Sequence, residues 1–170
     1  AEGVDDEVKS DAVKRYKSAM EWLANGEEAI ARAARYEVEI QQAPELLENA
    51  KRQLEAPAAK AGAQYPPDVS LTKMEQLLNQ VESQLKDAVQ TLSKREEELK
   101  RRTERKAELA KLTEETKQRL QELQKQAASS PPDSELPLVA AARRSENEAR
   151  VFALESQLAL YRAETQRYDA

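Results

Sequence analysis

Apolar residues recur at intervals of three and four along the middle of the chain. The members of this series are Leu71, Met74, Leu78, Val81, Leu85, Ala88 and Leu92. The register continues through polar residues and returns to apolar ones at Leu109, Leu120 and Leu123. An unbroken spacing of this kind is typical of one continuous helix that packs as in a coiled coil. We therefore expect a single helix over residues 70–127.

The segments on either side show a similar spacing. The apolar positions are Tyr16, Ala19, Leu23, Ile30, Ala33, Ile40, Leu47 and Leu54 in the first segment, and Val151, Leu154, Leu158, Tyr161 and Tyr168 in the last. They predict helices over about residues 5–55 and 136–169, each with one apolar side. Asn25-Gly26 weakens the first helix by about 1 kcal/mol relative to alanine. Pro44 predicts a kink or a short break, because it removes the bond to the carbonyl of Ile40.

Two proline-rich stretches, residues 55–70 and 128–137, separate the three helices, because paired prolines cannot continue a helix. Both contain Pro-Pro-Asp, which is either a weak internal repeat or a chance recurrence. Turning the chain back at Gly62 and Pro132 places Asn25-Gly26 beside Leu99, and Ala170 beside Lys94. Residues 1–30, 94–127 and 136–170 then form a three-helix bundle. Residues 31–93 remain as a two-helix arm.

A two-helix arm buries its apolar seam poorly, so we expect another protein part to cover it. The candidate partner-contact residues of this seam are Leu71, Met74, Leu78, Val81, Leu85, Ile40 and Leu47.

The composition also fits long helices rather than a compact core. Hydrophobic residues make up 39% of the chain, charged residues 35% and aromatic residues 4%, with three glycines. This apolar share suits narrow seams between helices and is too small for a thick layered core. The expected fold is all-α, an elongated antiparallel bundle of three long helices in a single domain over residues 1–170.

Charge and hydropathy limit the classes of partner. The net charge of −5 is mild and indicates no nucleic-acid partner. No apolar run approaches the roughly 20 residues of a membrane-spanning helix. The first residues lack the basic and apolar regions of a signal peptide. The last helix reaches Ala170 without a capping residue, so we expect the chain to be a fragment of a longer protein.

The chain offers little catalytic chemistry. Histidine and cysteine are absent, which removes the commonest general base, the commonest metal ligands and the usual nucleophile arrangements. The glutamates at 96–98 and 114–115 lie on predicted helices, where adjacent residues project in different directions and cannot converge on one ion or substrate. We expect no enzymatic activity, no cofactor and no metal site.

The segment from Lys94 to Lys106 mixes basic residues with glutamates. Pairs such as Glu96 with Lys100 have the favourable i, i+4 order, which predicts a helix stabilised by its own surface pairs. The alternative is a stripe that binds phosphates or lipid headgroups, but such a face normally carries unbalanced positive charge.

Three segments together resemble a known family. They are Ile40-Gln-Gln-Ala-Pro-Glu45, Ser70-Leu-Thr-Lys-Met-Glu-Gln-Leu77 and the closing stretch from Leu158 to Tyr168. In them the chain resembles the N-terminal periplasmic coiled-coil, or porin-type, domain of large MscS-type mechanosensitive channels, the potassium-dependent and miniconductance members. The resemblance covers nearly the whole chain from about Tyr16 onward.

The resemblance implies a periplasmic part of a bacterial inner-membrane channel that responds to osmotic shock. This part does not conduct and has no membrane span of its own. Its implied partners are other helices of the same or neighbouring channel subunits, with cell-wall components as a further candidate. The alternative is a free-standing coiled-coil adaptor of the cell envelope. Hydrophobic segments after Ala170 in the gene would favour the channel.

Overall fold

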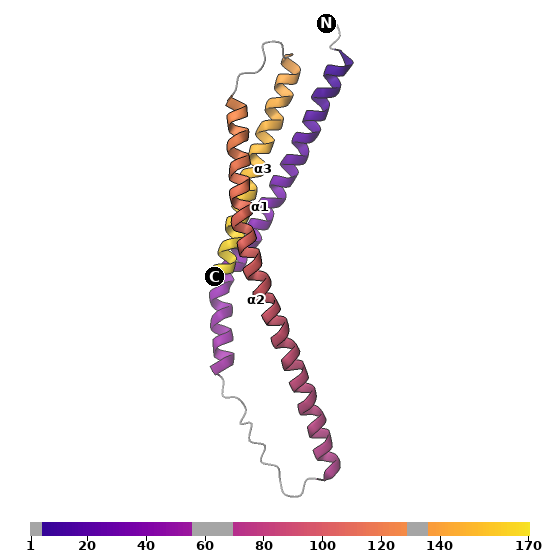
Figure 1. Cartoon of the computed structure of the whole chain (residues 1–170), viewed down its shortest axis with the longest axis vertical. Helices are drawn as coiled ribbons and strands as arrows, with labels where there is room; N and C mark the ends of the chain where they lie inside the picture. Colours follow the sequence, from indigo (N-terminus) through magenta and orange to yellow (C-terminus); the bar gives the residue numbers. More distant parts are fainter. Residues whose placement is uncertain (1–4, 56–69, 129–135) are drawn as a thin grey trace. The chain divides into compact units, whose positions relative to one another are not determined.

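The computed structural model describes residues 5–55, 70–128 and 136–170, and within them it contains three helices and no strand. The helices are α1 (Asp6–Glu55), α2 (Leu71–Ala128) and α3 (Pro137–Asp169) (Figure 1). The prediction of an all-α fold with three long helices is confirmed, and each observed boundary lies within one residue of the predicted one. Gly62, Pro132 and both Pro-Pro-Asp sequences lie outside the described residues.

The helix ends follow the expected local chemistry. Asp6 and Glu7 lie in the first turn of α1, where carboxylates interact favourably with the helix dipole. The carbonyl of Ser70 accepts bonds from the amides of Lys73 and Met74 at the start of α2. Pro137 opens α3, a position where its missing amide hydrogen removes no helical bond.

The chain forms two compact units, which we describe separately. The bundle comprises residues 1–44 and 106–170, and the second unit comprises residues 45–105. α1 passes through Pro44 without interruption, so the short break expected there is wrong. Proline removes a single backbone bond, and the surrounding bonds of a long helix keep it continuous. The kink expected at Pro44 stays a prediction.

Within the bundle, α1 and α3 run in the same direction and α2 runs in the opposite one (Figure 1). Glu146 of α3 contacts Arg15 near the start of α1, and Arg167 near the end of α3 pairs with Glu39. Lys106 Nζ lies 2.5 Å from Asp169 Oδ1, which joins the first residue of α2 in the bundle to the last residue of α3.

The register between the helices differs from the expected one. Trp22 of α1 lies beside Arg119 and Leu123 of α2, so Asn25-Gly26 is not beside Leu99. Asp169 meets Lys106, so the chain end is not beside Lys94. The expected register assumed that each pair of helices turns back at the middle of its connection. Side-chain packing sets the register instead, and the bundle therefore reaches residue 44 on α1 and begins at residue 106 on α2.

Small residues bring α1 and α3 together. Buried small residues recur at every seventh position on both helices, at Ala12, Ala19, Gly26 and Ala33 of α1 and at Ala142, Ala149, Ser156 and Ala163 of α3. Side chains of this size allow two helix axes to approach closely. On α2 the buried positions also repeat every seventh residue, at Leu109, Thr116 and Leu123. The core is thus a small-residue seam between two parallel helices, with larger side chains supplied by the leucines of α2 and α3.

This seam uses a different face of α1 from the predicted one. Of the expected apolar positions, Ala19 and Ala33 are buried, whereas Tyr16, Leu23 and Ile30 are exposed. The expected apolar side of α1 therefore coincides only in part with the side that the bundle buries. Close contact with α3 requires the small face of α1 to point inward, which leaves the large residues outside.

Gly26 contributes to this close contact, and α1 is continuous through it. A Cβ atom at this position would lie 2.6 Å from Phe152 Cε1 and 3.2 Å from the Cα atom of Ala153. Real Cβ atoms do not approach other atoms as closely as the first of these distances. The absence of a side chain at Gly26 therefore makes room for the Phe152 ring between α1 and α3.

Candidate interaction surface

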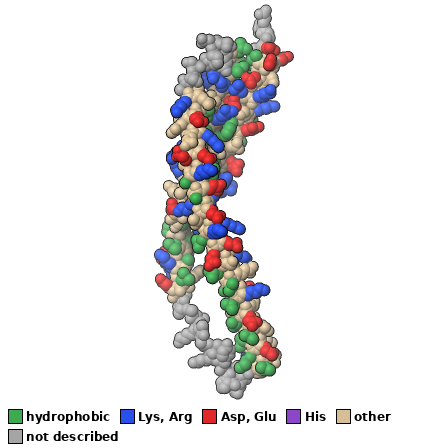
Figure 2. All heavy atoms as spheres, viewed as in Figure 1, with side chains coloured by type: hydrophobic (Ala, Val, Ile, Leu, Met, Phe, Trp, Pro, Cys, Tyr) green, Lys and Arg blue, Asp and Glu red, His purple; other side chains and the backbone are tan. Residues whose placement is uncertain are grey.

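The strongest candidate surface is the apolar stripe of α2, which we define as Leu71, Met74, Leu78, Val81 and Leu85. These side chains expose between 48% and 74% of their surface. They belong to the second unit, and Figure 2 shows hydrophobic side chains following α2 there. Their spacing of three and four residues is the one that a partner helix requires for coiled-coil packing. These five residues belong to the seam that we expect to be uncovered, and all five are exposed.

The remaining helical part of the second unit does not bury this stripe. Residues 45–55 of α1 are all exposed, and Leu47 exposes 52% of its surface. All five stripe side chains of α2 stay exposed within this unit. An apolar stripe of this extent on a long helix is typical of an interaction site.

Ile40 and Leu47 do not lie in the same unit. Ile40 belongs to the bundle, where it is half-buried, and Leu47 belongs to the second unit. The expected role of these two residues in a partner contact stays a prediction, as does that of the α2 stripe.

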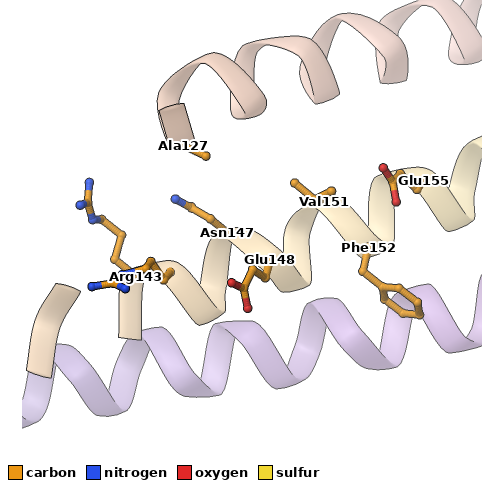
Figure 3. Close-up of a pocket in the computed structure, with 8 residues that line it drawn as sticks. Ala127, Arg143, Asn147, Glu148, Val151, Phe152 and Glu155 are labelled. Atoms are coloured by element: carbon orange, nitrogen blue, oxygen red, sulfur yellow. The ribbon is translucent and has the colours of Figure 1, made fainter. Parts of the chain in front are cut away.

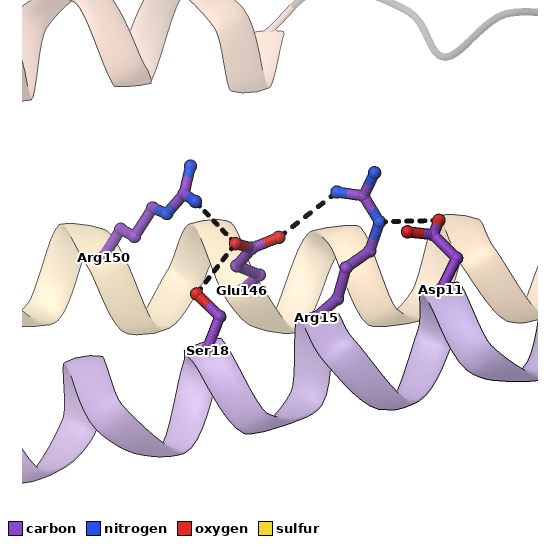
Figure 4. Close-up of polar contacts among 5 residues, drawn as sticks. All are labelled: Asp11, Arg15, Ser18, Glu146 and Arg150. Carbon is purple, nitrogen blue, oxygen red and sulfur yellow. Dashed lines mark hydrogen bonds and ion pairs between the residues drawn. The ribbon is translucent and has the colours of Figure 1, made fainter.

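A polar cluster joins α1 to α3 in the bundle (Figure 4). Glu146 exposes only 6% of its surface. Its carboxylate accepts bonds from Arg15 Nη1 at 3.2 Å, Ser18 Oγ at 3.0 Å and Arg150 Nη2 at 2.5 Å. The bond from Arg15 Nε to Asp11 and the charges of Asp11 and Glu146 raise the pKa of the Arg15 guanidinium, against the effect of burial. Both carboxylate oxygens of Glu146 thus have a donor, and two of the three donors lie on α1, so the cluster connects α1 to α3.

Replacing Glu146 by alanine is expected to lower the free energy of unfolding by about 1–2 kcal/mol. The variant loses the ion pairs to Arg15 and Arg150, but both arginines are partly exposed and regain water. Chemical denaturation followed by Trp22 fluorescence measures the change. The control is Glu148→Ala on the exposed side of α3, which is expected to change stability by less than about 0.5 kcal/mol. Equal losses in the two variants would contradict a structural role for the cluster.

A cavity of about 650 Å³ lies beside the end of α2 (Figure 3). Its lining residues are Ala127 of α2 and Arg143, Arg144, Asn147, Glu148, Val151, Phe152 and Glu155 of α3. Ala127 lies opposite the middle of the α3 segment that lines the cavity (Figure 3). The first turns of α3 therefore extend past the last turn of α2. The lining balances two arginines against two glutamates, so the cavity offers no net charge to an ionic ligand.

The segment from Lys94 to Lys106 carries its charges on the helix surface. Arg95 Nη1 lies 3.0 Å from Glu98 Oε2, a pair at i, i+3 rather than at the expected i, i+4. Both side chains are largely exposed, so the pair contributes little to stability. The alternative interpretation, a stripe that binds phosphates or lipid headgroups, is not supported, because positive and negative side chains are mixed in this segment.

Among residues 5–55, 70–128 and 136–170, no helix has a stretch of sufficient length and hydropathy to cross a membrane. In the same residues no group of three or more acidic side chains is placed to hold a metal ion.

The family model described as the mechanosensitive ion channel porin domain matches residues 1–169 and so covers both units. No curated protein and no solved structure matches the chain. Because the match spans nearly every residue, the chain belongs to the family of mechanosensitive ion channel porin domains.

Proposed function

We propose that this chain is a periplasmic interaction domain of a mechanosensitive channel that protects bacteria against osmotic shock, and that it does not itself conduct ions. The observation that carries the proposal is the exposed α2 stripe in a member of this family. Five large apolar side chains left in water favour association with another helix. Other helices of the same or a neighbouring channel subunit are the partners that the family supports, and cell-wall components are a further candidate.

The two units are proposed to act as one domain, since the family match spans both. Family membership also favours the channel over a free-standing adaptor of the cell envelope. The chemistry of the chain supports a non-enzymatic role, because histidine and cysteine are absent and the buried Glu146 is fully paired.

The test compares the full-length channel with two variants, one lacking residues 1–169 and one carrying Leu78→Lys and Leu85→Lys. We expect both variants to keep the single-channel conductance in membrane patches, because the chain lies outside the pore. Both are expected to change the opening pressure, or to lower survival after a hypo-osmotic downshift. The matched control is Gln80→Lys with Ser83→Lys, at exposed polar positions of the same helix.

Two results would contradict the proposal. A changed single-channel conductance would place the chain in the conducting path. Normal opening pressure and survival in the deletion variant would remove its role in the channel. Location is tested separately by fusing alkaline phosphatase after Ala170 within the gene, since this enzyme becomes active only after export. An inactive fusion would contradict the periplasmic assignment.

A further inference from the structure

A second exposed apolar series lies on α1, within the bundle. Its large members are Val13, Tyr16, Met20, Leu23 and Ile30, which expose between 40% and 69% of their surface. The steps between them are three, four and three residues, and Glu27 occupies the position between Leu23 and Ile30. We call these six residues the outer stripe. It is separate from the α2 stripe, and nothing in the proposed function depends on it.

The outer stripe has the geometry of a coiled-coil seam. Steps of three and four residues keep side chains on one line of the helix, where they can insert between the side chains of a second helix. This line borders the small-residue face that α1 turns toward α3, and its large side chains stay exposed in the bundle. Ala24 and Ala31 are exposed and follow the large residues Leu23 and Ile30. Such small side chains leave room for a second helix to approach.

Charge selects the orientation of that second helix. Glu27 is the one ionised member of the outer stripe, and Lys17 lies directly after Tyr16; both are exposed. If two copies of α1 paired in parallel and in register, Glu27 would face Glu27 of the second copy, and like charges would oppose the contact. In an antiparallel pair centred between Glu21 and Trp22, Tyr16 meets Glu27 of the second copy, and Lys17 lies next to that carboxylate.

The same antiparallel register matches the apolar members. Val13 meets Ile30 of the second copy, and Met20 meets Leu23. Because the arrangement is two-fold symmetric, each contact occurs twice, which is the usual geometry of a protein homodimer. Every large residue of the outer stripe then faces an apolar residue or Glu27, and each Glu27 has a lysine and a tyrosine hydroxyl beside it.

We propose that two copies of this chain associate in antiparallel orientation through the outer stripe of α1. The contact covers the large side chains that the bundle leaves exposed, and the two pairs of Lys17 with Glu27 fix the register.

The first experiment measures the dimerisation constant of the 170-residue chain by sedimentation equilibrium. Glu27→Lys and Lys17→Glu are each expected to weaken dimerisation at least tenfold, because each places like charges in contact. The double variant Lys17→Glu/Glu27→Lys restores opposite charges and is expected to return to within about threefold of the original chain. Glu28→Lys is the matched control: it makes the same change one residue away, off the outer stripe, and is expected to leave the constant unchanged.

The second experiment tests the orientation with introduced cysteines, since the chain has none of its own. A mixture of Val13→Cys and Ile30→Cys chains is expected to form a disulfide-linked dimer. Neither variant alone should do so, because equivalent positions would lie about 26 Å apart along the helices, well beyond disulfide reach.

Three results would overturn the proposal. The first is a chain that stays monomeric at every concentration. The second is a dimer that is indifferent to the charge exchange or that cross-links Val13→Cys to itself. The third is a dimer that is lost in Leu78→Lys/Leu85→Lys but kept in Glu27→Lys, which would place self-association on the α2 stripe.

Discussion

Replacing Leu109 by alanine lowers the free energy of unfolding by about 3 kcal/mol, the largest loss that we expect from a single truncation in this chain. Leu109 exposes 1% of its surface and is the largest fully buried side chain among the described residues. Removing its isobutyl group leaves a cavity between helices that are held in place by the small-residue seam. Denaturant unfolding followed by Trp22 fluorescence measures the loss, because Trp22 lies in the bundle beside α2.

The matched control is Leu99→Ala on the same helix. Leu99 lies in the second unit and exposes 62% of its surface, so its truncation is expected to change stability by less than about 0.5 kcal/mol. The two variants make the same chemical change ten residues apart. Similar effects on stability would mean that α2 is not buried in the bundle at Leu109.

Replacing Gly26 by alanine is expected to lower the free energy of unfolding by about 1–3 kcal/mol. The sign of this change in stability is informative, because helix propensity alone would make alanine more stable than glycine by about 1 kcal/mol. The new methyl group would lie 2.6 Å from the Phe152 ring, so the ring must move or the two helices must separate. Thermal unfolding followed by circular dichroism measures the net effect.

Two companion variants separate packing from helix propensity. Phe152→Ala in the Gly26→Ala background removes the obstructing ring, and we expect a coupling of at least about 1 kcal/mol between the two substitutions. Asn25→Ala changes an exposed neighbour and is expected to raise stability by a few tenths of a kcal/mol through propensity alone. If Gly26→Ala were stabilising to the same extent, the close approach of α1 to α3 would be wrong.

The number, type and limits of the helices could be predicted from the sequence. The spacing of apolar residues from Leu71 to Leu92 is sufficient for this, because a helix repeats about every 3.6 residues whatever surrounds it. The proline pairs end helices for an equally local reason, the missing amide donor and the clash of the ring. The exposure of the α2 stripe follows from a similar local argument, since a pair of helices buries an apolar seam poorly.

The inward face of α1 could not be predicted from hydrophobicity alone. Tyr16, Leu23 and Ile30 have larger apolar side chains than the α1 residues that the bundle buries, and a rule based on apolar side-chain size selects them first. A signal was nevertheless present: alanine or glycine at every seventh position from Ala12 to Ala33, matched by small residues from Ala142 to Ala163. Glu146 lies beside that second series, and no pattern in the sequence marks its bonds to Arg15 and Ser18.

The sequence by itself determined three long helices, their ends and membership of the channel porin domain family, because these depend on local backbone chemistry and on residue order. Only the tertiary structure decided which face of α1 is buried, how far α2 and α3 are shifted from the expected register, and which carboxylate is buried. These depend on how closely two helix axes can approach. That distance is set jointly by residues more than one hundred positions apart, such as Gly26 on α1 and Phe152 with its small neighbour Ala153 on α3.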